Sequence, residues 1–193
     1  MPSLADGLAR LLEVLDRLEI PYAIGGSVAS TFYGNLRTTN DVDLVAKIAP
    51  HQIDELVELL VPEFYADAGM IREALARGRA FNVIHIPSAY KFDVFPLKTD
   101  AYSQASFGRR SFRELRSLGP GPIECAVATA EDTILRKLEW YRTGGETSER
   151  QWNDLRGILA VSGPVLDYAY LRQWAPQLHV ADLLEKLLAE QAP

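Results

Sequence analysis

Two aspartates, two positions apart, are the residues whose type and spacing most clearly suggest chemistry. Asp41 and Asp43 begin the segment Asp-Val-Asp-Leu-Val-Ala, whose alternation predicts a β-strand. Residues i and i+2 of a strand point to one face, so the two carboxylates should stand side by side. Aspartate is disfavoured in strands and like charges on one face repel, so a bound divalent cation would account for the pair. Oxygen ligands in an open site suit Mg²⁺, or Mn²⁺, held jointly with substrate phosphates. A solvated edge strand, or a turn capped by the aspartates, is the alternative.

A third carboxylate, Asp93, lies at the centre of the apolar segment 90–97. An unpaired buried aspartate costs free energy, so its side chain should meet a cation or a hydrogen-bond donor. If this strand lies beside the first, the three carboxylates form a cluster that can hold two metal ions. One ion would activate the attacking oxygen, and the other would be bound to a nucleoside triphosphate. A salt bridge from Arg37 or Lys91 is the alternative for Asp93.

A glycine turn precedes these aspartates. Gly25-Gly26-Ser27 connects a short apolar strand to a helix predicted over 27–33. Glycine lets the backbone approach a phosphate closely, and a helix N-terminus offers free N–H groups. Ser27 adds a hydroxyl donor. A Gly-Gly turn before a helix is also a common tight connection, so the turn alone does not decide the function.

Apolar periodicity predicts the elements that must position these residues. Leucines from 4 to 18 mark an amphipathic helix, and Pro50 opens another. Strands are predicted over the segments 41–48, 81–86, 90–97 and 123–128, with a weak one near Phe64. From Thr129 onward the capping signals and spacings predict helices alone. We therefore expect an α+β fold, with a mixed-sheet core over 1–128 and a C-terminal helical bundle over 129–193 packed on it.

The composition restricts the class of protein. Hydrophobic residues make up 48% of the 193 residues and charged residues 24%, as in ordinary soluble globular proteins. A net charge of −6 argues against a dedicated, non-specific nucleic-acid binder. Cys125 is the single cysteine, so no internal disulfide can form and a reducing compartment is expected. Since no apolar run reaches transmembrane length, we expect a cytoplasmic protein without a membrane partner.

Taken together, the motifs resemble a known superfamily. In chain order they are Gly25-Gly26-Ser27, Arg37-Thr38, Asp41-Val-Asp43 and a later strand with Asp93. This order resembles the nucleotidyltransferases built on the DNA polymerase β-type palm, and more closely the AbiEii-like nucleotidyltransferase toxins and their uncharacterised bacterial relatives. The segments 131–138 and 148–155 are similar to that group's later lysine and Arg-x-x-x-Asp motifs. The likeness therefore covers roughly residues 20 to 160.

The resemblance implies an enzyme and a role for each matching residue. It implies metal-dependent transfer of a nucleoside monophosphate from a triphosphate such as ATP to a hydroxyl, with a site for two Mg²⁺ ions. The implied metal-binding and catalytic residues are Asp41, Asp43 and Asp93. The implied nucleotide-binding residues are Gly25, Gly26, Ser27, Arg37 and Lys137. Arg150 and Asp154 would be the contribution of the C-terminal helical region to the site. The alternative for these two residues is an i,i+4 ion pair with each other. The alternative for Lys137 is an ordinary solvated side chain.

The acceptor of such a transfer stays open at the level of sequence. An RNA such as tRNA, or a protein, would suit a toxin with a cognate antitoxin. A small molecule of the aminoglycoside type is the competing acceptor. The alternative to an enzyme is a non-catalytic protein that binds a nucleotide or a partner. On a helix, Arg109, Arg113 and Arg116 would share a face and could grip an RNA backbone. A merely solubilising surface is the alternative for these arginines.

Overall fold

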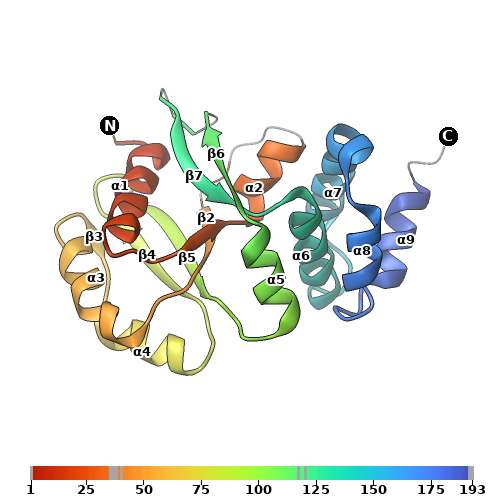
Figure 1. The fold of residues 1–193 in the computed structure, drawn as a ribbon. Coiled ribbons are helices and arrows are strands. Elements are labelled where there is room, and N and C mark those ends of the chain that lie inside the picture. Colours follow the sequence, from red (N-terminus) through yellow and green to blue (C-terminus); the bar gives the residue numbers. More distant parts are fainter. Residues whose placement is uncertain (1, 35–38, 40, 117, 120, 191–193) are drawn as a thin grey trace.

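A mixed β-sheet forms the centre of the molecule. The structure is a computed structural model and describes residues 2–34, 39, 41–116, 118–119 and 121–190. The described residues form one seven-stranded sheet with the order β3-β4-β5-β2-β1-β7-β6 (Figure 1). In that order its strands are Phe64–Tyr65, Phe81–His85, Tyr90–Pro96, Asp41–Ala46, Tyr22–Ile24, Ile123–Val127 and Ser111–Leu115. The pairs β2–β5 and β1–β7 are parallel, and the other neighbours are antiparallel.

One group of helices buries the apolar face of this sheet. It consists of α1 (Leu4–Arg17), α3 (Ile53–Leu60) and α4 (Ala68–Ala76), with a short 3-10 turn, η1 (Pro50–Gln52), before α3. The leucines that mark α1 in the sequence pack against Val42, Leu44 and Phe92 in one core. Burial of this apolar area stabilises the sheet and leaves the alternate residues of β2 and β5 directed to the other face.

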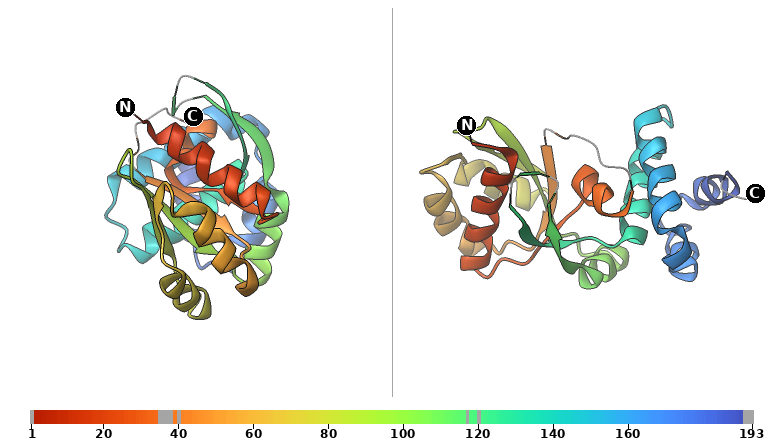
Figure 2. Two further views of the ribbon diagram at one scale, coloured as in Figure 1. Left: turned by 90° about the vertical axis from the view of Figure 1, so that its left-hand side faces the viewer. Right: turned by 90° about the horizontal axis from the view of Figure 1, so that it is seen from above.

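The remaining helices lie on the opposite side of the molecule. They are α2 (Gly26–Tyr33), α5 (Ala101–Arg109), α6 (Ala130–Thr143), α7 (Glu149–Ser162), α8 (Tyr168–Trp174) and α9 (Ala181–Ala189), with the 3-10 turn η2 (Gly163–Val165) before α8. Helices α6 to α9 share a second hydrophobic cluster, to which α5 contributes Tyr102. Helix α2 contacts β2, α6 and α7, and so lies between the sheet and the helical bundle (Figure 2).

Two glycines permit close approaches of α2 to its neighbours. A Cβ on Gly34, at the end of the helix, would lie 2.8 Å from the backbone nitrogen of Ile158 in α7. At the start of α2, Gly26 has a φ of +55°. The C-terminal end of α2 therefore packs against the α7 backbone where a side chain would not fit, and its N-terminal end has a backbone conformation that favours glycine.

The predicted α+β fold is confirmed, while two local expectations differ from the structure. Helix α4 was not expected, although Asp67 caps it by accepting a hydrogen bond from the backbone nitrogen of Met70. The segment 103–118 does not form one helix, because α5 ends at Arg109 and an edge strand, β6, follows. The helix on which Arg109, Arg113 and Arg116 would share a face is therefore not formed.

Candidate active site

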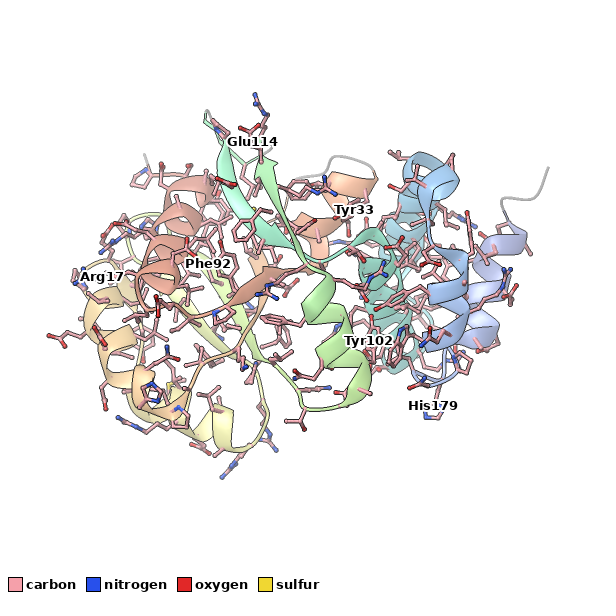
Figure 3. The ribbon with its side chains drawn as sticks, viewed as in Figure 1. Arg17, Tyr33, Phe92, Tyr102, Glu114 and His179 are labelled. Carbon is pink, nitrogen blue, oxygen red and sulfur yellow. The ribbon has the colours of Figure 1, made fainter. Side chains whose placement is uncertain are left out.

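The three aspartates of the sequence motifs lie on one face of adjacent strands. In the parallel pairing of β2 with β5, Asp43 is opposite Asp93, and Asp41 is opposite Lys91. The intervening residues, among them Phe92 (labelled in Figure 3), are buried in the core beneath α1. The expectation that the two strands are neighbours is confirmed, and alternation then directs all three carboxylates to the face opposite α1.

The carboxyl group of Asp43 has a raised pKa. Burial, the largest cause, and the negative charges of Asp41 and Asp93 together raise its pKa to about 6. The positive charges of Lys137 and Lys91 act in the opposite direction. A half-buried carboxylate beside two others is costly to ionise in the free protein, and a cation held among them would remove that cost.

The glycine turn lies directly against Asp43. The backbone N–H of Gly25 donates a 2.9 Å hydrogen bond to the carbonyl oxygen of Asp43. A Cβ built on Gly26 would lie 1.9 Å from the Asp43 carboxylate oxygen Oδ2. The positive, N-terminal end of α2 therefore lies at the face of the sheet that carries Asp41, Asp43 and Asp93, which we call the carboxylate face. This arrangement suits phosphates bridged to a cation there.

Asp41 and Asp93 each have a nearby partner. The Thr39 hydroxyl donates a 2.8 Å hydrogen bond to Asp41 Oδ1. Lys91 Nζ lies 2.7 Å from Asp93 Oδ2, so the salt bridge considered for Asp93 from sequence is present. Across the described ranges, no three His, Cys, Asp or Glu side chains form a ready-made metal site. The donor chemistry fits Mg²⁺, and an ion bound through Asp93 Oδ2 would take the place of the Lys91 ammonium.

The helical bundle brings a buried ion pair to the same region. Lys137 Nζ of α6 lies 2.7 Å from Asp154 Oδ2 of α7, and only 8% and 12% of these side chains are exposed. The alternative of a solvated Lys137 is therefore wrong. Since Lys137 also lowers the pKa of Asp43, it lies on the carboxylate side of the bundle. Arg150 is exposed in the first turn of α7, and Arg37 lies outside the described residues.

An aromatic pair borders the carboxylate face and was not anticipated from sequence. Phe95 follows Asp93 by two positions and therefore shares its face of β5. Its ring packs against Trp140 of α6, with ring centroids 6.3 Å apart. Trp140 is 54% exposed. The alternation that pairs Asp41 with Asp43 would also have placed Phe95 beside Asp93.

Three arginines of the segment 109–116 have partners within the chain. Arg109 pairs with Glu131 at 3.0 Å and lies over the ring of Tyr170. Arg110 lies over the ring of Phe107, and Arg116 pairs with its near neighbour Glu114 (labelled in Figure 3). The Arg109 contacts join α5 to the helical bundle, and the two ion pairs neutralise charge locally, so Arg109, Arg113 and Arg116 do not form one basic stripe.

A cavity of about 240 Å³ opens elsewhere, between the start of α5, helix α6 and the loop after α8. Its lining includes Lys98, Asp100, Tyr102, Arg136, Glu139 and Gln177. None of the three aspartates lines it, and Arg136 is already satisfied by Glu139 and by the Ser103 hydroxyl. The carboxylate face, rather than this cavity, carries the convergent chemistry.

Comparison with solved structures identifies the fold. The chain is similar to an antigenic nucleotidyltransferase-like protein from Paracoccidioides brasiliensis, with a TM-score of 0.58 and 17% identity, covering 98% of this chain and 90% of that one. It is also similar to the lincomycin-bound lincosamide antibiotic adenylyltransferase LnuA, with a TM-score of 0.52 and 12% identity, covering 83% of this chain and 99% of that one. The chain therefore has a nucleotidyltransferase fold.

The comparisons by sequence are negative. No protein-family model matches the chain, and no curated protein matches it. Only the sequence motifs support a particular resemblance to the AbiEii-like toxins. In the part of the chain that the structure describes, no helix has both the length and the apolar character needed to cross a membrane.

Proposed function

We propose that this chain is a Mg²⁺-dependent nucleotidyltransferase that uses Asp41, Asp43 and Asp93. The observation that carries the proposal is the register of β2 and β5, which sets Asp43 opposite Asp93 on the face that also carries Asp41. The nucleotidyltransferase fold supports it. Two divalent ions, when bound, would neutralise the phosphates and lower the pKa of the attacking hydroxyl. Residues 1–128 would form the catalytic core, with 129–193 as the helical region.

The reaction is an in-line displacement at the α-phosphorus of the triphosphate. The acceptor oxygen forms a bond to that phosphorus, the bond to the β-phosphate oxygen breaks, and pyrophosphate leaves. Asp93 helps to activate the hydroxyl by accepting its proton. Catalysis therefore depends on positioning and charge neutralisation, without a covalent enzyme intermediate.

The nucleotide would be held by the N-terminal end of α2. Gly26 and Ser27 would supply backbone N–H groups and a hydroxyl to the phosphates, and Gly25, whose N–H is donated to the Asp43 carbonyl oxygen, would let the backbone approach them closely. Lys137 adds a positive charge on the side of the helical bundle. The family resemblance assigns Arg37 to nucleotide binding. It also assigns Arg150 and Asp154 to the part of the site that the C-terminal helices would form.

For the acceptor, we propose an RNA such as tRNA, or a protein, in a toxin–antitoxin-like setting in the cytoplasm. The likeness of the motifs to AbiEii-like toxins supports this choice, and a cognate antitoxin would then be a partner. A small-molecule acceptor is the second candidate. It is favoured by the similarity in fold to a lincosamide adenylyltransferase and by the pairing of Arg109 and Arg116 within the chain.

A labelling experiment tests both the activity and the acceptor. The full chain is incubated with Mg²⁺ and each α-labelled nucleoside triphosphate, against total RNA, cell protein and a panel of aminoglycosides and lincosamides. We expect label on one acceptor class, and a loss of about 100-fold or more in Asp41→Asn and Asp43→Asn. Glu58→Gln, an exposed carboxylate on α3, is the matched control and should retain activity.

Two outcomes would overturn parts of the proposal. Label transfer that survives in Asp41→Asn would refute the metal assignment. If the wild-type chain transfers no label and binds no triphosphate by calorimetry, the protein is a non-catalytic, partner-binding descendant of the fold.

A further inference from the structure

Lys91 provides one positive charge to the whole carboxylate face. It is opposite Asp41 in the pairing of β5 with β2, and it shares the open face with Asp93. Its ammonium nitrogen lies 2.7 Å from Asp93 Oδ2. The hydrogen bond to Asp93 raises the pKa of Lys91, and the charges of Asp93, Asp41 and Asp43 raise it further. One ammonium thus interacts with all three carboxylates.

The two members of the Lys91–Asp93 pair differ in their freedom to move. The Lys91 side chain is 44% exposed, while that of Asp93 is 19% exposed. Lysine carries its charge on a flexible four-carbon chain, and exposed ion pairs are weak. Lys91 can therefore leave Asp93 for solvent at little cost, whereas Asp93 is held by its strand.

The present arrangement of Asp93 suits Lys91 rather than a metal ion. Asp41, Asp43 and Asp93 share one face, but in the described part of the chain no three acidic, His or Cys side chains are placed to hold one ion as they stand. An oxygen that accepts from an ammonium at hydrogen-bond distance cannot also bind a divalent cation without bringing two positive charges together. A divalent ion that binds Asp93 through Oδ2 must therefore displace the Lys91 ammonium.

We propose that Lys91 is a positioning residue, an internal counter-cation that holds Asp93 when no metal is bound and must be displaced when a divalent ion enters. The proposal rests on the proposed function in taking Asp93 as a metal ligand. It goes further by making the affinity for the metal a competition with a side chain of this protein. Lys91 offsets the repulsion among Asp41, Asp43 and Asp93 in the metal-free state, and it lowers the affinity for the first ion.

The alternative is that Lys91 is an ordinary ion pair of the sheet surface. In that case its removal would change stability slightly and leave metal binding alone. The competition makes the opposite prediction, because removal of the ammonium frees Asp93 and restores the full negative charge of the face.

Titration of the full chain with Mn²⁺ alone, without nucleotide or acceptor, separates the two. Free Mn²⁺ is followed by its electron paramagnetic resonance signal in wild type, Lys91→Met, Lys91→Arg and Lys47→Met. We expect Lys91→Met to bind Mn²⁺ about tenfold more tightly than wild type. Lys91→Arg should bind as wild type or more weakly. Lys47→Met removes the same charge just beyond β2, where Lys47 is exposed, and should change the affinity less than about twofold.

The outcomes distinguish this proposal from the proposed function. If wild type binds Mn²⁺, Asp43→Asn does not, and Lys91→Met binds no more tightly than wild type, the competition is overturned and the metal site stands. If no variant binds Mn²⁺, both are overturned. Far-ultraviolet circular dichroism checks the folding of Lys91→Met, and Lys91→Gln replaces it if the methionine variant misfolds.

Discussion

Asp43 of β2 and Asp93 of β5 are direct partners in a parallel strand pairing, with their carboxylates on the same face. Two like charges opposite each other destabilise a sheet, and the half-buried position of Asp43 makes its ionisation costlier still. The metal-free protein therefore contains a local electrostatic cost at the place where the proposed chemistry needs negative charge.

Stability of the metal-free protein should depend on pH through Asp43. Its pKa is raised from 3.8 to about 6, mainly by burial, so the folded state binds more protons than the unfolded chain between these values. Stability therefore falls as pH rises through this window, and the full cost is present above pH 6. Asp43→Asn should gain about 2 kcal/mol over wild type at pH 8 and little near pH 4. Urea unfolding in the presence of a chelator measures both.

Glu58→Gln is the control for this pH dependence, since Glu58 is an exposed carboxylate on α3. Its unfolding free energy should follow that of wild type at both pH values. An Asp43→Asn gain of equal size at pH 4 and pH 8 would contradict the assignment, because an effect of packing alone does not depend on protonation.

Gly26→Ala should displace the Asp43 carboxylate. The new Cβ would lie 1.9 Å from Asp43 Oδ2, and φ at this position is +55°. We expect a stability loss of about 1–2 kcal/mol from the backbone conformation alone. Mn²⁺ affinity should fall about 10- to 100-fold because a ligand is moved.

Gly78→Ala isolates the effect of the collision. Gly78 has a φ of +60°, but a Cβ there meets nothing within 4 Å. Its stability loss should match the backbone part of the Gly26→Ala loss, with Mn²⁺ binding unchanged. Equal Mn²⁺ affinities in the two variants would show that the contact between Gly26 and Asp43 does not position the carboxylate.

The carboxylate pair of β2 could be predicted because the information is local. Alternation along 41–46 puts Asp41 and Asp43 on one face whatever the rest of the fold does. The place of Asp93 depends on which strand lies next to β2, and that is decided by long-range packing of the apolar face beneath α1. The sequence therefore yielded a conditional prediction that the strand order made definite.

Other features were missed for identifiable reasons. The arginine stripe assumed a helical period through 103–118, but the chain leaves α5 at Arg109 and extends into β6. Lys91 was considered only as a competitor for Asp93, because its simultaneous interaction with Asp41 depends on the register between two distant segments. The pairing of Lys137 with Asp154 depends on how α6 and α7 pack, whereas spacing along one helix suggested only Arg150 for Asp154.

The buried pair of Lys137 and Asp154 should be important for stability. With only 8% and 12% of the two side chains exposed, Lys137→Met takes the paired ammonium away from a buried carboxylate. We expect a loss of about 3 kcal/mol in unfolding free energy. The double variant Lys137→Met/Asp154→Leu should recover much of it, which a double-mutant cycle by urea unfolding would quantify.

An exposed pair provides the comparison for this effect. Arg172 and Glu185 are each 57% exposed, so Arg172→Met should change stability by less than about 0.5 kcal/mol. Calorimetry with a triphosphate then tests the second role proposed for Lys137. A lower stability with unchanged triphosphate affinity would contradict that role and leave Lys137 as a structural residue.

Arg109 should be a structural residue that joins α5 to α6, whereas Arg116 should not. Arg109 lies 3.0 Å from Glu131 and 3.6 Å from the fully buried Asp132, so Arg109→Met leaves two buried acids without this guanidinium and should cost about 3 kcal/mol. Arg116 pairs with Glu114 at an exposed site, and Arg116→Met should change stability by less than about 0.5 kcal/mol. Urea unfolding compares the two. An Arg109→Met protein as stable as wild type would refute the structural role. A loss of RNA affinity in that stable variant would favour the RNA-binding alternative for these arginines over a solubilising surface.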